Sequence, residues 1–480
     1  MVGRVGTGLL FLAMVASALL AGPAVVKVLG SKPGLVVGLS LQAAFAVLFA
    51  FASQQPSGSA LQWSSYLLGA VISGGGSGIA WTAQGTFFAR TVTLLASVPP
   101  EASAASRPFD GTEVFTRTMS NPAENSFRRS PSPFMPGRFR RAVTIGTPWG
   151  RLGAESGDRS RDRALSLVTL RQDIFTSAVS VGSEPGVEEE LQEDPSAITA
   201  TLAGRFAAVL LIVDVLVKVL SGLLQGSFFQ WHFLSSPLNL VTVLYALAAL
   251  SATSAALSSA LAEPKRQVSQ ALLRRASATP CQAVFAAVAL WPSWKVWLLS
   301  FTNLAFGLSA GYMNGVVNTN LAAASPLFGE ASIGTLMALT SLLASLLAWP
   351  LSKVSMYTGK GFVLGLGSLA LAAIPLAVVW GQPNESNRYW GSWLLVLYAL
   401  QGLGRSVYEG ANRAVFADMF SEAESSGAFA NCMMQSGLAF FTSFLLQVFL
   451  PGATCDVTVA AMVVGSSSMA LPGYFVARRL

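Results

Sequence analysis

The chain has 480 residues, of which 52% are hydrophobic and only 11% are charged. A typical soluble domain carries roughly 25% charged residues. Residues 98–197 hold 26 of the 53 charged side chains, which leaves 27 for the other 380 residues. This composition excludes a soluble globular protein and predicts an all-α membrane protein, because a charge in hydrocarbon costs several kcal/mol.

The charge and the rare residue types narrow the possible functions further. The net charge is +7, and the basic residues lie in short connections between apolar runs. No basic stripe interleaved with aromatic residues is present, so nucleic-acid binding is not expected. Three cysteines exclude a disulfide framework, and the single histidine, His232, excludes most metal sites. We expect no cofactor, no metal and no enzymatic activity.

Eleven apolar runs are long enough to cross about 30 Å of hydrocarbon. In chain order they are 5–22, 34–52, 63–96, 200–225, 237–261, 294–317, 331–349, 361–380, 389–403, 427–450 and 457–477. The ninth run is short, and we expect its helix to continue to about Arg413. The first run also resembles a signal peptide, but cleavage would place Lys27 and Lys32 outside, so we expect this run to be retained.

Lysine and arginine in the short loops predict the orientation. One set of loops carries twelve such residues and the alternate set carries only Arg4 and Arg388. The basic set is Lys27, Lys32, Lys265, Arg266, Arg274, Arg275, Lys353, Lys360, Arg405, Arg413, Arg478 and Arg479. We therefore expect a multi-pass protein with a cytosolic C-terminus, and the sequence does not indicate which membrane holds it.

Two similar loops indicate an internal repeat. Gly30-Ser-Lys-Pro-Gly34 and Gly359-Lys-Gly361 each follow a proline that we expect to mark a helix end, and they lie six spans apart. A six-helix unit used twice is typical of secondary transporters. The sixth span lacks an upstream partner, so we expect that a first helix was lost or precedes the sequence given.

The domain organisation follows from this repeat. We expect an N-terminal bundle interrupted by a disordered cytosolic insert, a cytosolic linker, and a C-terminal bundle. The expected parts are 1–97 and 198–261 for the N-terminal bundle, 98–197 for the insert, 262–293 for the linker and 294–480 for the C-terminal bundle. Ser130 in the insert and Ser277 in the linker lie in arginine-containing patterns typical of kinase substrates, and Asn384 begins a glycosylation sequon.

Polar residues within the spans are candidates for a solute or ion cavity, because ionisable groups at this depth normally face the bundle interior. Asp214 and Lys218 share one helix face at i, i+4 spacing. The other candidates are Trp81, Gln84, Asn303, Tyr312, Asn314, Asn318, Asn431 and Gln435. The alternative for Asp214 and Lys218 is a structural ion pair, and for the amides it is hydrogen bonding between helices.

A charged cluster at the inner end of the ninth span predicts a cytosolic gate. Arg405, Glu409 and Arg413 recur at i, i+4, i+8, with Asp418 beyond them. We expect this ladder to oppose the basic loop residues Lys32, Lys353 and Lys360. A solvated surface network is the alternative.

Three elements resemble the Unc-ninety-three family of the major facilitator superfamily. They are the loop 23–38, the element Trp81-Thr-Ala-Gln-Gly85, and the element from Gly402 to Asp418. The resemblance implies a two-bundle major facilitator fold with a central cavity and alternating access. It also implies an alternative function, because better-known relatives regulate or escort other membrane proteins, including potassium channels and innate immune receptors. We therefore carry two hypotheses: a transporter of a small solute or ion, and a non-transporting partner of a membrane protein.

Overall fold

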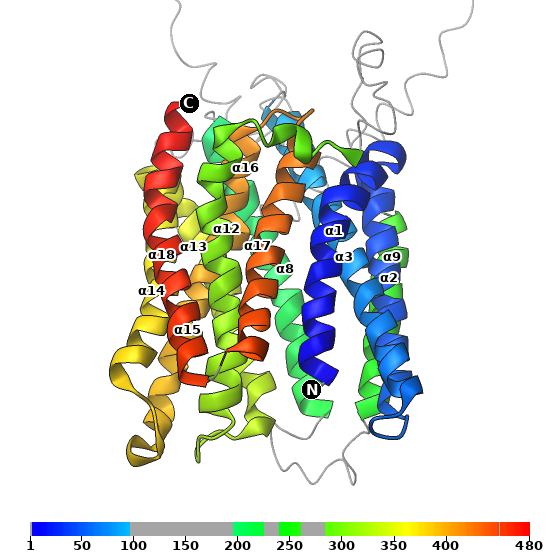
Figure 1. Ribbon diagram of the computed structural model, residues 1–480. Coiled ribbons are helices and arrows are strands. Elements are labelled where there is room, and N and C mark those ends of the chain that lie inside the picture. Colours follow the sequence, from blue (N-terminus) through cyan, green and yellow to red (C-terminus); the bar gives the residue numbers. More distant parts are fainter. Residues whose placement is uncertain (1, 97–194, 225–239, 261–283, 451) are drawn as a thin grey trace, which may run out of the picture. The chain divides into compact units, whose positions relative to one another are not determined.

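The computed structural model describes residues 2–96, 195–224, 240–260, 284–450 and 452–480, and these belong to one compact unit (Figure 1). Every regular element in this described part is helical, which confirms the all-α prediction. The predicted insert up to residue 194, most of the predicted linker, Ser130 and Ser277 lie outside the described residues.

Each of the eleven predicted spans falls on a described helix. These helices are α1 (Val2–Leu29), α2 (Ser31–Ser53), α3 (Ala60–Ala96), α8 (Pro195–Leu224), α9 (Leu240–Ala260), α12 (Trp294–Tyr312), α13 (Ile333–Thr358), α14 (Lys360–Gly381), α15 (Leu394–Val407), α17 (Ser425–Phe449) and α18 (Gly452–Arg479). Short elements fill the described connections: η1 (Val288–Leu290), η3 (Glu330–Ser332) and η4 (Glu385–Trp393). Within the described residues, eight helices are long and apolar enough to cross a membrane.

Single glycines form the two repeated loops. Gly30 joins α1 to α2 with φ of 103°, and Gly359 joins α13 to α14 with φ of 83°. A side chain is disfavoured at such positive φ, so glycine permits the abrupt reversal between helices. The prediction that prolines end these helices was wrong, since Pro23 and Pro350 lie inside α1 and α13.

The ninth span begins later and extends further than its apolar run. Residues 388–391 have positive φ, so the helix starts at Leu394. The π-helical segment η5 (Tyr408–Asn412) and α16 (Arg413–Met419) then continue α15 without a break, which confirms the expected extension to Arg413. A second π-helical segment, η2 (Met313–Ala322), continues α12 in the same way.

The helix pairs that join the two parts of the chain follow the predicted repeat. Here the first half means α1–α3, α8 and α9, and the second half means α12 to α18. α1 packs on α17, and α8 packs on α13. A six-span shift exchanges α1 with α13 and α8 with α17, so each pair maps onto the other, as two-fold related bundles require. The two termini lie at opposite ends of the helices (Figure 1).

Glycines in α3 allow close approach of its neighbours. A Cβ added to Gly78 would lie 2.6 Å from the backbone nitrogen of Ala18 on α1, and one added to Gly76 would lie 2.9 Å from the carbonyl oxygen of Gly38 on α2. A Cβ on Gly75 would meet nothing within 4 Å. The glycine run therefore packs α3 against two helices, as small residues do between membrane helices.

Candidate functional site

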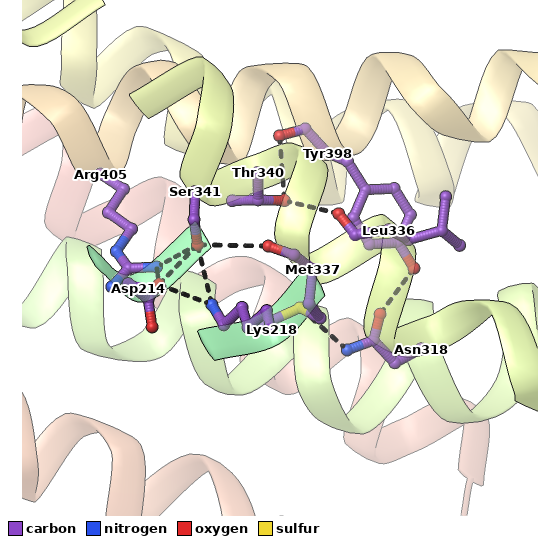
Figure 2. Close-up of polar contacts among 9 residues, drawn as sticks. All are labelled: Asp214, Lys218, Asn318, Leu336, Met337, Thr340, Ser341, Tyr398 and Arg405. Atoms are coloured by element: carbon purple, nitrogen blue, oxygen red, sulfur yellow. Dashed lines mark hydrogen bonds and ion pairs between the residues drawn. The ribbon is translucent and has the colours of Figure 1, made fainter. Parts of the chain in front are cut away.

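Asp214 is the centre of a charged cluster between the two halves of the chain. Its carboxylate lies 2.9 Å from the Lys218 ammonium on the same helix and 2.8 Å from the Arg405 guanidinium on α15. The Ser341 hydroxyl on α13 donates to Asp214 over 2.6 Å and accepts from both cations at 2.8 Å. Figure 2 shows the four side chains converging from α8, α13 and α15.

The cluster faces the interior of the protein. Val209, Ile212, Val213 and Leu216 are exposed and recur at helical spacing, so they form one apolar face of α8. At 100° per residue, Asp214 and Lys218 lie roughly opposite that face. They share this side of α8 with residues buried against α13, including Ala207 and Leu211. The charged groups therefore point away from the surface that lipid would cover.

The cluster also lies near the middle of its helices. Asp214 precedes the end of α8 at Leu224 by ten residues, and Arg405 follows the start of α15 at Leu394 by eleven. Both helix ends lie on the side opposite the C-terminus (Figure 1). At 1.5 Å per residue both side chains are rooted roughly 15 Å from that side, about half of a 30 Å hydrocarbon layer. Arg405 therefore lies farther from the helix ends than the predicted cytosolic gate requires, and its place in such a gate stays a prediction.

Serine hydroxyls of α13 join this helix to α8 on the side of the charged cluster that faces the start of α8. Ser345 donates to the Ala208 carbonyl oxygen at 2.9 Å, and Ser352 donates to the Ala200 carbonyl oxygen at 2.6 Å. Both serines share a face with Ser341. Ser345 follows Ser341 by four residues and Ser352 follows Ser345 by seven, which correspond to one and two helical turns. Small residues on this face bring the two backbones close together.

A second set of predicted residues forms a polar chain on the far side of Met337. Asn318 donates to the Met337 sulfur at 3.4 Å and to the Asn314 amide oxygen at 3.2 Å, and accepts from the Tyr398 hydroxyl at 2.6 Å. Figure 2 shows Met337 lying between these hydrogen-bonded residues and Ser341. The Ser341 hydroxyl also donates to the Met337 carbonyl oxygen at 3.2 Å. Tyr312, predicted with this group, is buried and its hydroxyl has no hydrogen-bond partner in the described part.

Three other predicted amides form hydrogen bonds between helices. Asn303 donates to Gln435 at 2.7 Å and accepts from Asn412 at 2.8 Å, which joins α12, α17 and η5. Asn431 accepts from the Trp291 indole at 2.9 Å and donates to the Ala287 carbonyl oxygen at 2.8 Å. All three predicted amides are buried. The structure favours the structural alternative for them, because their polar atoms already have partners.

Trp81 and Gln84 on α3 have different surroundings. The Trp81 ring lies 4.8 Å from the guanidinium carbon of Arg413, which also pairs with Glu409. Arg413 is 3% exposed, so its charge is held by the Glu409 carboxylate and by two aromatic faces from the first half, those of Trp81 and, at 5.7 Å, Phe206. Gln84 is half-buried and has no hydrogen bond to any described residue. Its role as a cavity residue stays a prediction.

The predicted gate is divided between two places. Lys360, at the start of α14, pairs with Asp418 in α16, at the end of the helices where the C-terminus lies. A cavity of about 410 Å³ adjoins this pair and is lined by both residues and by Lys295, Ser355 and Arg478. Lys353 instead lies 4.8 Å from the ring of Trp349, and no ion pair involves Lys32 among the described residues. Arg405 and the Glu409 and Arg413 pair thus have separate partners, and the role of this ladder as a gate stays a prediction.

Asn384, the predicted glycosylation residue, caps η4. Its side-chain oxygen accepts hydrogen bonds from the backbone of Ser386 at 3.0 Å and from the Ser386 hydroxyl at 2.6 Å. The residue is exposed in a short connection between α14 and α15. Its use as a modification site stays a prediction.

Sequence reasoning missed Ser341, Asn412 and Tyr398. Ser341 follows Thr340 in the middle of an otherwise apolar run, and this pair of hydroxyls was the available signal. Asn412 directly precedes Arg413 in a charged segment that we assigned to the gate, so its amide was overlooked. Tyr398 lies in the apolar part of the ninth run, where a tyrosine ring alone does not indicate a polar contact.

Comparison with known proteins gives two informative similarities. The chain is 26% identical to mouse Protein unc-93 homolog A over 181 residues, which cover 38% of this chain and 37% of that relative. The matched segment therefore spans about a third of the relative's length. The structure of the proton:xylose symporter XylE of the major facilitator superfamily superposes with a TM-score of 0.54 at 10% identity, covering 99% of this chain and 85% of the symporter. No family model matches the chain.

Proposed function

We propose that this Unc-93-like protein with the major facilitator fold moves a small solute or ion across a membrane by alternating access between its two helical halves. The observation that carries the proposal is the contact between Asp214 on α8 and Arg405 on α15. It joins the two halves through charges near mid-membrane. Ionisable groups at this depth usually mark a solute or proton path, because an apolar pair would hold the helices together at lower cost.

The partners of Asp214 suggest how such a step would work. The carboxylate holds Arg405 across the two halves and Lys218 on its own helix. When the halves rock apart, the Arg405 contact must break, and a proton or solute that competes for either group would favour this separation. Lys218 stays beside Asp214 in both states because the two residues share one helix face.

The second moving contact would lie beside the Lys360 and Asp418 pair, where the Ser196 hydroxyl on α8 donates to Asp418 over 3.4 Å and so joins the two halves. We place it on the cytosolic side, because the basic connections predict a cytosolic C-terminus. The Lys360 and Asp418 pair itself lies within the second half, where it joins the start of α14 to α16 next to the cavity of about 410 Å³. Asp418 is 30% exposed, so the pair is weak enough to open and close during a transport cycle.

A specific observation favours a second function, that of a non-transporting partner of another membrane protein. In the second half, hydrogen bonds to neighbouring elements engage the amides of Asn303, Gln435 and Asn431, so these amides are not free for a solute. Such bonding would rigidify this half of the protein. A rigid set of helix faces serves binding to a membrane protein better than it serves movement.

Flux in proteoliposomes separates the two functions. The purified protein is reconstituted with a pH-sensitive dye inside and challenged with small carboxylates, sugars and nucleosides. We expect flux that Asp214→Asn abolishes and that Asp456→Asn retains, because Asp456 on α18 is outside the cluster. A folded wild-type protein that gives no flux and co-purifies stoichiometrically with a membrane protein would contradict transport and support the second function.

A further inference from the structure

The charges in the Asp214 cluster do not balance. One carboxylate faces two cations, Lys218 at 2.9 Å and Arg405 at 2.8 Å, and the fourth member, Ser341, is neutral. The acidic group nearest in sequence to Arg405 is Glu409, and it is already paired with Arg413. The cluster therefore carries one excess positive charge near mid-membrane, where an uncompensated charge is costly.

The excess charge can be reached from within the protein. The side chains of Lys218, Asp214 and Arg405 are 23%, 29% and 20% exposed, respectively. Asp214 and Lys218 project from the side of α8 that is opposite its exposed apolar face. Their remaining exposure therefore opens toward the interior between the halves, and the cluster is not sealed by protein.

Cationic groups without complete partners continue from the cluster along α8 and α16. Arg205 lies nine residues before Asp214 on α8, and its buried Nε atom has no hydrogen-bond partner among the described residues. The Nε atom of Arg413 is buried and unpartnered in the same way. Buried donors in native proteins are normally paired, so two orphaned guanidinium nitrogens require an acceptor.

The geometry points to an anion as the ligand of the Asp214 cluster: a small carboxylate or phosphate-type solute that binds Lys218 and Arg405 and balances their excess charge. This inference rests on the proposed function only for the statement that the anion is carried; binding itself does not require transport. A carboxylate or phosphate fits because both offer two oxygens to the planar guanidinium of Arg405. A cationic solute would meet two positive charges and one carboxylate that is already engaged.

The number of charges in the cluster can be varied without large changes in shape. Lys218→Gln leaves the ion pair of Asp214 and Arg405, which has no net charge. Asp214→Asn leaves two cations without a carboxylate. Lys218→Arg keeps the wild-type charge. Lys27→Gln makes the same change as Lys218→Gln at an exposed position near the end of α1, so it is the matched control.

Binding is measured as the rise in thermal unfolding midpoint of the detergent-purified protein with lactate, benzoate or inorganic phosphate. Potassium, choline and glucose are the contrasting probes, and a bulky sulfonate salt keeps the ionic strength constant. We expect at least one anion to stabilise the wild type, Lys218→Arg and Lys27→Gln alike. We expect Lys218→Gln to weaken the apparent affinity about tenfold or more, and Asp214→Asn to strengthen it.

Stabilisation by potassium or choline in place of the anions would overturn the inference. So would anion binding that survives unchanged in Lys218→Gln, or that falls equally in Lys27→Gln. Flux of the stabilising anion in proteoliposomes is then measured separately. Anion binding without flux would retain this inference and contradict transport, whereas flux of neutral solutes without anion binding would retain transport and contradict this inference.

Discussion

The carboxylate of Asp214 on α8 lies 2.8 Å from the guanidinium of Arg405 on α15, although 191 residues separate them in the sequence. The pair explains why both helices tolerate a charge near mid-membrane, because each charge has an opposite partner across the halves. Ser341 connects them further by donating to Asp214 and accepting from Arg405. The contact is therefore a structural tie as well as a candidate site.

Removing one member of this tie should have unequal effects. Arg405→Gln leaves Asp214 paired with Lys218, whereas Asp214→Asn leaves Lys218 and Arg405 facing each other without a carboxylate. We expect Asp214→Asn to destabilise by about 1–3 kcal/mol, below the full cost for a buried pair because the groups are partly exposed, and Arg405→Gln to cost less. Thermal unfolding in detergent measures the order.

The double variant Asp214→Asn with Arg405→Gln is the control for this order. It restores part of the stability lost in Asp214→Asn, because only one cation then remains in the cluster. An Arg405→Gln loss that exceeds the Asp214→Asn loss would show that the excess positive charge is compensated by some other group.

The glycine run of α3 offers a second comparison within a single motif. A Cβ on Gly78 would lie 2.6 Å from the backbone nitrogen of Ala18, whereas one on Gly75 would meet nothing within 4 Å. We expect Gly78→Ala to destabilise by about 1–3 kcal/mol, because the α1 backbone cannot move aside freely. Gly75→Ala should be neutral or stabilise by up to about 1 kcal/mol through helix propensity. Equal unfolding midpoints for both variants would contradict the described contact of α1 with α3.

The fold was predictable because hydropathy alone locates spans of this length. Apolar runs coincide with every described long helix, and the glycines at 30 and 359 mark two of the tight connections. Proline was a poor guide to helix ends, since Pro23 and Pro350 lie within helices. Membrane helices tolerate proline because neighbouring helices and side chains satisfy the backbone groups that it frees.

The site was harder to predict because it depends on pairing between helices distant in sequence. Arg405 follows an apolar run, so local reasoning placed it at the membrane surface. Its true partner, Asp214, lies in another helix, and only the packing of α8 against the second half brings them together. In the same way, the sequence around Asn303 does not indicate whether its amide binds Gln435 or a solute.

Asn303 and Gln84 should respond in opposite ways to the same type of substitution. Asn303→Leu removes the donor to the buried Gln435 amide oxygen and the oxygen that accepts from the buried Asn412 amide, which costs about 1–3 kcal/mol in stability. Gln84→Leu removes an amide that has no partner among the described residues, so stability should be unchanged. If Gln84 contacts the solute, its variant alone reduces solute affinity, which a binding titration on both purified proteins would measure.

The orientation of the helices can be tested with single cysteines in a Cys281→Ser background, where Cys432 and Cys455 are buried. Ser57 between α2 and α3 and Thr358 at the end of α13 are both exposed, and they lie at opposite ends of the helices. We expect a membrane-impermeant thiol reagent to label Ser57→Cys on intact membranes and Thr358→Cys only after permeabilisation. The reverse pattern would place the basic connections outside, against the positive-inside rule.

The Lys360 and Asp418 pair should control access to the adjoining cavity. Ser355 lines this cavity and is 4% exposed, so a cysteine placed there reports opening through its rate of reaction with a thiol reagent. Asp418→Asn should raise the labelling rate about fivefold, which corresponds to a lost contact of about 1 kcal/mol for a partly exposed pair. Exchanging the two charges, as Lys360→Asp with Asp418→Lys, should bring the rate back toward that of the unmodified pair. If the exchanged pair reacts as fast as Asp418→Asn, the ion pair is not what closes the cavity, and the contacts of Tyr474 and Met356 at its walls become the better explanation.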